Sequence, residues 1–148
     1  MNEALLLEIL DGLLKDLKEI PDNPKSAPLF KKVIANNAPI WTEVATTPAV
    51  CFYLADTTYD DMDRLRFHGT SIIKIYVYNK HKTRGLSLPD ILSPLINVIK
   101  AEVQKLPDLE APILNAFITS VKRDGGTVLP YTIAELTLEV EFAERKTC

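Results

Sequence analysis

The first hydrophobic pattern in the chain is that of an amphipathic helix over residues 3–20. Leucine and isoleucine recur at steps of three and four residues, and charged residues occupy the rest of the helical wheel. The apolar stripe consists of Leu6, Ile9, Leu10, Leu13, Leu14 and Leu17. Asn2 is placed to cap this helix, and Pro21 predicts its end near Ile20. We expect the proline-rich, polar connector that follows, residues 21–28, to form no regular structure.

Stretches rich in β-branched and aromatic residues predict the next three elements as strands. The first covers residues 30–35, and the second covers residues 49–55, directly after Pro48. A long acidic loop is expected over residues 56–63, followed by a third strand from Leu65 to Tyr78.

The third strand has no polar face over its strongest part. One face carries Ile73, Ile75 and Val77, and the other carries Ile72, Tyr76 and Tyr78. A strand that is apolar on both faces needs cover on both, so we expect something beyond one layer of helix to pack here.

A second amphipathic helix is predicted over residues 88–106, ended by Pro107, and two strands follow it at about 113–122 and 132–142. The helix stripe consists of Leu92, Leu95, Val98, Ile99, Val103 and Leu106. In the last strand apolar residues alternate with Glu135, Thr137, Glu139 and Glu141. This alternation indicates a strand with one face on the core and one acidic face toward water.

The order of these elements is helix, three strands, helix, two strands. This order predicts an α+β sandwich in which a mixed or antiparallel sheet of about four to five strands packs against two main helices on one side. The chain has 148 residues, which fits a single domain spanning residues 1–148. Within it we expect the strands and second helix over residues 28–143 and a short tail at 144–148.

Composition narrows the class of protein without naming a function. Hydrophobic residues make up 47% and charged residues 25%, which excludes a wholly disordered chain. The net charge of −3 disfavours a generally basic nucleic-acid binder. Apolar runs are too short to span a membrane, and Glu3 and Glu8 stand where a secretory signal needs positive charge. We expect Cys51 to be a small buried residue, Cys148 to be frayed, and the chain to fold in a reducing cytoplasm.

Candidate catalytic motifs are weak throughout the sequence. The acidic run Asp56, Asp60, Asp61 and Asp63 lacks the glycine and closing glutamate of a calcium loop, and His68 and His81 stand in no ligand-spaced motif. There is no nucleophile elbow and no phosphate-binding glycine loop. We therefore predict no catalytic, cofactor-binding or metal residues. The competing class is a small metal-dependent hydrolase that would use Asp60, Asp61, Asp63 and His68.

Two charged features remain after this search. One is the acidic row Glu135, Glu139 and Glu141, and the other is a basic loop containing Lys80, His81, Lys82 and Arg84. Each taken alone is most simply a solvated surface. A sheet whose outer surface is partly apolar and partly acidic is, however, typical of an oligomer with a lined interior.

In this arrangement the chain resembles the tail terminator (tail completion) proteins of long-tailed bacteriophages. The resemblance rests on the leucine-rich first helix, the strand at residues 48–53 with the acidic segment after it, the strand at 72–78, the helix near Pro89 and the closing strand at 134–142. It is a likeness of patterns and lengths over most of the chain. Head–tail connector proteins share the size and class, and a connector or neck ring of the same virion is the alternative.

The resemblance implies a homo-oligomeric, hexameric ring. Such a ring caps the tail tube, ends its polymerisation and offers a docking surface to the head, so its partners are the tail tube protein and head–tail connector proteins. DNA passes through the lumen without specific binding, and the sheet lines that channel. The implied location is the head-proximal end of the virion tail, with the host cytoplasm during assembly, and no membrane contact or catalysis is implied.

Three hypotheses about sites follow from our own interpretation of the residues. The first places Glu135, Glu139 and Glu141 at the lumen, where carboxylates repel DNA phosphates. The second places Ile72, Tyr76 and Tyr78 near a subunit contact, where aromatic anchors are common. The third assigns axial docking to the two charged loops, through Asp60, Asp61, Asp63, Lys80, Lys82 and Arg84.

Overall fold

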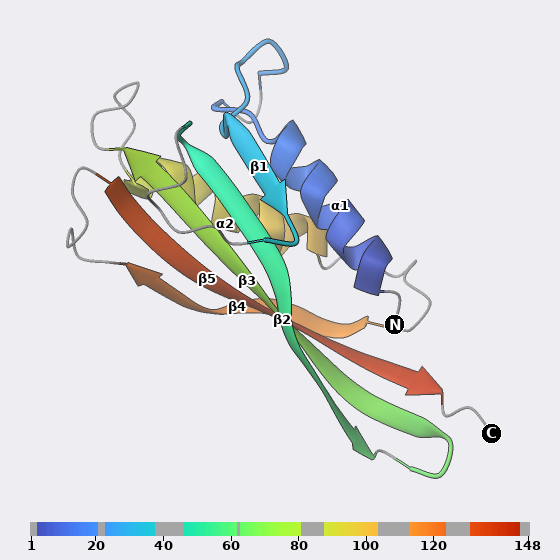
Figure 1. Cartoon of the computed structure of the whole chain (residues 1–148). Coiled ribbons are helices and arrows are strands. Elements are labelled where there is room, and N and C mark those ends of the chain that lie inside the picture. Colours follow the sequence, from blue (N-terminus) through green and yellow to red (C-terminus); the bar gives the residue numbers. More distant parts are fainter. Residues whose placement is uncertain are drawn as a thin grey trace.

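The computed structural model describes residues 3–20, 23–37, 46–61, 63–80, 88–103, 113–123 and 131–145. They form two helices and one five-stranded sheet (Figure 1). The elements in chain order are α1 (Glu3–Asp16), β1 (Lys32–Ala35), β2 (Ala49–Asp61), β3 (Arg66–Lys80), α2 (Leu88–Val103), β4 (Ile113–Arg123) and β5 (Tyr131–Arg145). The predicted order of elements and the α+β class are confirmed.

The sheet is mixed, and its spatial order is β1-β2-β3-β5-β4. Only β1 and β2 run parallel, and the other neighbours are antiparallel. The last strand of the chain therefore lies between β3 and β4. This central place explains the regular alternation of β5, because Ala134, Leu136, Leu138 and Val140 are all at most 1% exposed.

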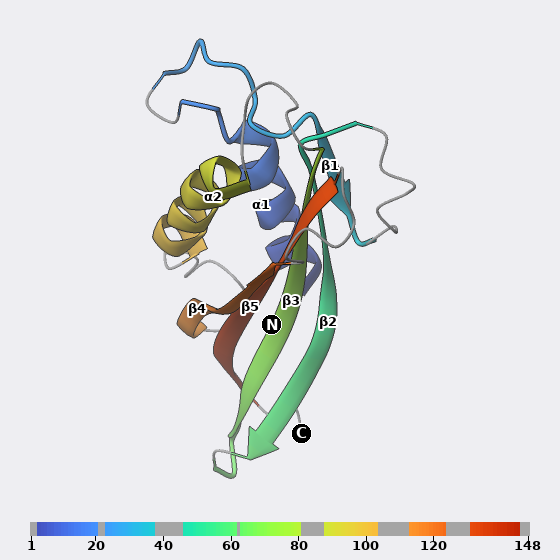
Figure 2. The ribbon, with the colours of Figure 1, turned by 90° about the vertical axis from the view of Figure 1, so that its left-hand side faces the viewer.

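Both helices cover the same face of the sheet, as Figure 2 shows. Leu6, Leu10 and Leu14 of α1 are buried against this face, as are Ile91, Leu92, Leu95 and Ile99 of α2. Ile73, Ile75 and Val77 of β3 meet them from the sheet. Fully burying one such aliphatic side chain contributes roughly 1.5–3 kcal/mol, so this core is a major source of the favourable free energy of folding.

The first helix is shorter than the sequence predicts, since it ends at Asp16 and not near Ile20. The connector pairs with the residues that follow the helix: Leu29 N donates to Leu17 O at 2.8 Å, and Glu19 N donates to Ala27 O at 2.9 Å. An isolated bridge joins Lys18 to Pro28. This pairing satisfies backbone hydrogen-bonding groups in an extended conformation. Part of the connector therefore forms regular structure, contrary to the prediction.

The predicted acidic loop at 56–63 is wrong, because β2 continues through Asp61. After a register shift between Leu54 and Asp56, pairing with β3 runs on to Asp61 and Phe67. Pairing with a neighbouring strand here outweighs the low strand propensity of aspartate. β5 likewise extends to Arg145, which shortens the predicted tail. The end of the predicted second helix, 104–106, lies outside the described residues.

The end of the β2–β3 hairpin, residues 56–66, projects beyond the helices and is called the arm below (Figure 1). At its base Thr57 Oγ1 donates to Glu3 Oε1 of α1 at 2.9 Å. Further out, the ring of Tyr59 meets the rings of Phe67 and Phe142 edge-on, at centroid distances of 6.1 and 5.9 Å. The arm is thus held by aromatic contacts in place of a helix.

Candidate functional site

The face of the sheet that points away from the helices, called the outer face, carries two of the three predicted groups. In the β3–β5 register Tyr76 lies opposite Glu135, and Ile72 lies opposite Glu139. The hypotheses assigned these residues to separate surfaces, a subunit contact and a lumen. The structure brings them together on one face. The sequence predicts cover on both faces of β3. No described helix covers the outer face, because α1 and α2 both lie on the other side of the sheet (Figure 2).

One carboxylate of the acidic row is paired with a lysine on the same face, and a second lies near a histidine. Lys74 Nζ lies 2.9 Å from Glu135 Oε1 and donates to Thr137 Oγ1 at 2.9 Å. His68 Nε2 lies 4.0 Å from Glu141 Oε2. Pairing with Lys74 removes most of the field of Glu135, so the negative charge of the outer face is concentrated toward the arm. There Glu139 and Glu141 are joined by Asp56 and Asp60, which the register places on the same face.

Three tyrosines form a ladder at the other end of the outer face, where Tyr53 lies opposite Lys74 in the register. The Tyr53 and Tyr76 rings stack at 6.1 Å with planes 8° apart, and those of Tyr76 and Tyr78 stack at 6.5 Å with planes 20° apart. Tyr78 is only 5% exposed. It therefore offers little surface to a partner, and Tyr76, which is half-buried, is the better candidate for a contact.

The ladder covers Cys51, which is fully buried as predicted. Its thiol donates weakly to the carbonyl oxygen of Tyr76 at 3.9 Å. Burial raises the pKa of Cys51 to about 11 and that of Tyr76 to about 12, and it also raises the pKa of Tyr78. All three groups are protonated at neutral pH, so the cluster offers no thiolate nucleophile.

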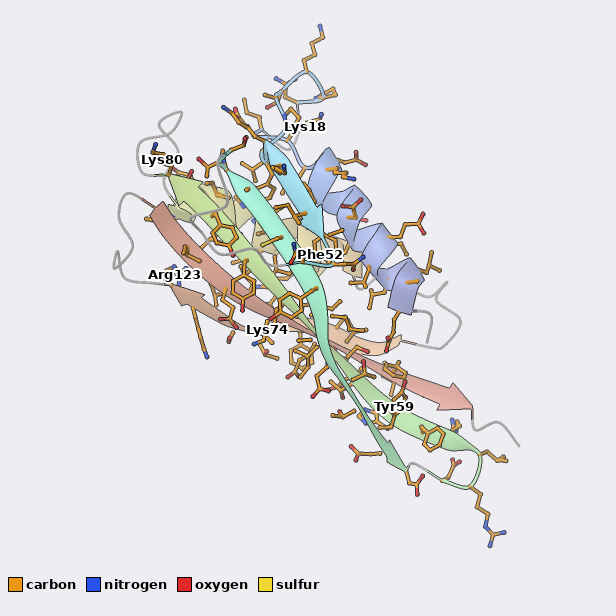
Figure 3. The ribbon with its side chains drawn as sticks, in the orientation of Figure 1. Lys18, Phe52, Tyr59, Lys74, Lys80 and Arg123 are labelled. Carbon is orange, nitrogen blue, oxygen red and sulfur yellow. The ribbon has the colours of Figure 1, made fainter. Side chains whose placement is uncertain are left out.

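Those charged docking residues that the structure describes lie at the two ends of the long hairpin. Asp63 belongs to the turn, where it accepts hydrogen bonds from Leu65 N at 2.7 Å and Arg66 N at 2.9 Å. The bond from Leu65 N, followed by the bonds and charge of Arg66, lowers the pKa of Asp63. Lys80 is exposed at the opposite end of β3 (Figure 3). Lys82, Arg84 and His81 lie outside the described residues.

The alternative metal site is brought together only in part, because His68 lies opposite Asp60 in the β2–β3 register but Asp61 does not share their face. Asp60 and Asp61 are consecutive in a strand, so they point to opposite faces of the sheet. Within the described ranges, no group of three or more His, Cys, Asp or Glu side chains could hold a metal ion. In the same part of the chain, no helix is long and apolar enough to cross a membrane.

One feature that the sequence pattern did not reveal is a groove between α1 and α2, with a volume of about 740 Å³. Its apolar lining includes Leu13, Leu17, Pro94 and Val98, and its polar lining includes Asp16, Lys18, Glu19, Asp90 and Glu102. Both helices are amphipathic in sequence, but how far apart they pack is fixed only by the folded sheet beneath them.

Comparison with known proteins does not assign a function to this site. No protein-family model matches the chain, and no curated protein matches it significantly. The function is therefore inferred from the outer face, the arm and the sequence pattern.

Proposed function

We propose that this protein is the tail terminator of a long-tailed bacteriophage. It forms a ring, hexameric as in the family that it resembles, which caps the tail tube, ends its polymerisation and presents a surface for the head to dock. Its partners are further copies of itself, the tail tube protein and head–tail connector proteins. The ring acts at the head-proximal end of the virion tail after assembly in the host cytoplasm, and its role requires no catalysis and no cofactor.

The placement of both described helices on one side of the sheet carries this proposal. A ring around DNA needs a solvated surface lining its channel, and this surface must not bind phosphate. The outer face fits this need, because it holds half-exposed carboxylates at Glu139 and Glu141 while the apolar side chains of β5 turn toward the helices. Around such carboxylates the field extends over about 8 Å at physiological salt, which covers much of a narrow channel.

The mass of the purified protein over a concentration series, together with negative-stain images, tests the ring. We expect hexameric rings, or rings that appear once tail tubes are added, and tubes that stop growing when capped. A protein that stays monomeric at every concentration and in the presence of tubes would overturn the proposal. Divalent-metal binding in stoichiometric amounts, coupled to hydrolysis, would instead support the hydrolase.

Co-sedimentation separates a terminator from a connector ring. The protein is incubated in parallel with purified tail tubes and with tailless, DNA-filled heads. A terminator sediments with the tubes and requires no head, whereas a connector ring sediments with heads in the absence of tubes. Binding to heads alone would move the assignment to the connector.

A further inference from the structure

The sheet has two long open edges among the residues that the structure describes (Figure 1). On one side β4 is the last strand of the order, and only β5 lies beside it. On the other side β1 covers β2 only as far as Phe52, so from Tyr53 to Asp61 the one described neighbour of β2 is β3. An open edge presents unpaired backbone N–H and C=O groups, and the partner that satisfies them is another extended strand.

On each open edge one backbone donor is taken by the side chain just before it in the sequence. On β2, Thr57 N donates to Asp56 Oδ1 at 2.9 Å. On β4, Ala116 N donates to Asn115 Oδ1 at 3.0 Å. Such short-range bonds stand in for the acceptor that a neighbouring strand would supply, and they compete with pairing to that strand.

The two capped donors lie in the same row of the sheet. Thr57 lies opposite Ser71 on β3, and Ser71 lies opposite Val140 on β5. Val140 in turn lies opposite Ala116 on β4. The two edges are therefore open at the same level. Each step from β2 through β3 and β5 to β4 reverses the strand direction, so β4 runs antiparallel to β2.

The edge strand β4 exposes apolar side chains and lacks the charges that keep an edge from pairing. Leu114 is 51% exposed and Phe117 is 36% exposed. Residues 113–121 carry no charged side chain, so this part of β4 can lie beside Asp56 and Asp60 of β2 without repulsion between like charges. A long edge strand of this composition is prone to pair with a further strand.

We propose that the open edge of β4 in each subunit pairs with the open edge of β2 in the next subunit. The inference rests on the ring of the proposed function and names the contact that closes it. When the outer faces of all subunits line one channel and their strands run along it, neighbouring sheets meet edge to edge. Rotation about the channel keeps the direction of every strand, so β4 meets β2 of the next copy in the antiparallel arrangement.

Pairing requires both capped donors to change acceptors. Thr57 N and Ala116 N must leave the side chains of Asp56 and Asn115 and turn to the neighbouring strand. These two side chains therefore restrain the pairing of free subunits, and the restraint is lifted only where two edges meet along their length.

Cysteine cross-linking tests the contact, in a background in which Cys148→Ser removes the terminal thiol. Phe117→Cys is combined in turn with Asp56→Cys, Thr58→Cys and Asp60→Cys on the same face, because the tilt of strands around a barrel offsets their pairing. Within one molecule the strand spacings separate Phe117 from Asp56 by about 14 Å, and a disulfide needs Cα atoms within about 7 Å. Oxidation of at least one pair should therefore give a series of linked copies on a non-reducing gel.

The matched control combines Phe117→Cys with Ile72→Cys. Ile72 lies on the same face and in the same row as Phe117, but β3 is enclosed by β2 and β5. Edge-to-edge pairing keeps these two positions apart both within a molecule and between neighbours, so this pair should give no linked copies. Cross-linking of the control as strong as that of the edge pairs would show that the sheets meet face to face, and it would overturn the contact.

Removing the two side-chain acceptors tests the restraint. Asp56→Ala with Asn115→Ala leaves both backbone donors free, so rings should form at a concentration lower by about threefold or more than in the control. The control is Asp56→Asn, which has the same net charge as the double variant but keeps an acceptor at both positions. Rings that form in the double variant only at the same or a higher concentration would overturn the restraint.

The outcomes separate this inference from the proposed function. Linked copies from an edge pair support the contact, even if the protein fails to cap tubes. Rings of normal mass that give no linked copies with any edge pair overturn the contact and leave the terminator role intact. A protein that stays monomeric with and without tubes, and gives no linked copies, overturns both.

Discussion

At the scale of single residues, Gly69 shows how a missing side chain shapes the arm. Gly69 lies between Tyr59 on β2 and Phe142 on β5 in the register of the sheet. The ring of Phe142 folds over it and is fully buried, and the ring of Tyr59 meets that ring edge-on. A methyl group on Gly69 would clash with Cζ of Phe142 and would lie 2.5 Å from Cε2 of the same ring, well inside ordinary contact distance.

Gly69→Ala is therefore expected to destabilise the protein. Alanine gains about 0.5–1 kcal/mol over glycine in a strand through lower backbone entropy of the unfolded chain. Displacing a buried ring typically costs about 1–3 kcal/mol, so the loss outweighs the gain. Urea unfolding measures the difference, with Thr70→Ala as the neighbouring control. Equal stability of Gly69→Ala and the wild type would show that the ring of Phe142 moves aside at no cost.

The buried groups of the tyrosine ladder predict a loss of stability in alkali. The folded state holds the protons of Cys51 and Tyr76 up to a pKa of about 11 and about 12, above their values of 9.0 and 10.0 in the unfolded chain. Above pH 9 the unfolded state thus binds fewer protons than the folded state, and the free energy of unfolding falls as the pH rises toward 11. Urea midpoints at pH 7.5, 9.5 and 10.5 should fall in that order.

Cys51→Ala isolates the contribution of the thiol. This variant loses some packing at every pH, but its stability should decline less between pH 7.5 and 10.5 than that of the wild type. In the Cys148→Ser background, Cys51 should also react with a thiol reagent only as fast as the protein unfolds. Rapid labelling of Cys51 in the native state would contradict its burial beneath the tyrosines.

At the scale of elements, the sequence patterns located both helices and all five strands but missed where some of them end. Periodicity is a local property, and it is strong wherever an element has one buried face, as in α1 and β5. The end of α1 and the length of β2 depend on partners distant in the chain: Leu29 bonds to Leu17, and Phe67 pairs with Asp61. No local pattern around Asp16 or Asp61 contains that information.

The candidate site, like the elements, could be predicted from the sequence only in part. Alternation along β5 is enough to put Glu135, Glu139 and Glu141 on one face, and the structure agrees. It does not say that Ile72 and Tyr76 share that face, because this depends on the register between β3 and β5. Nor does it reveal that Lys74 pairs with Glu135, or that α1 and α2 leave a groove between them.

At the scale of the whole molecule, the helices and the outer face divide the surface into two sides of different character. In the proposed ring the outer face is turned toward DNA, and its charge is concentrated at Glu139 and Glu141. The helical side carries the groove between α1 and α2 and is turned away from the channel in that ring. This division allows the charge of the channel to be changed without altering the helices.

Reversing the charge of the channel should therefore hinder DNA without preventing assembly. Glu139→Lys with Glu141→Lys gives rings of normal mass, but these rings should retain DNA in a salt-dependent way and lower infectivity. Glu8→Lys, an exposed change on α1, serves as the control. Rings that pass DNA and support infection as well as the wild type would show that the outer face does not line the channel.

The position of β5 has a consequence for synthesis of the protein. The last of the described strands in chain order is the one that fills the middle of the sheet, between β3 and β4. Until it is complete, β3 has an open edge and β4 has no partner, and such edges are prone to aggregation. The sheet can therefore close only once β5 has been synthesised and paired. A chain that still lacks β5 presents no finished sheet to a second copy.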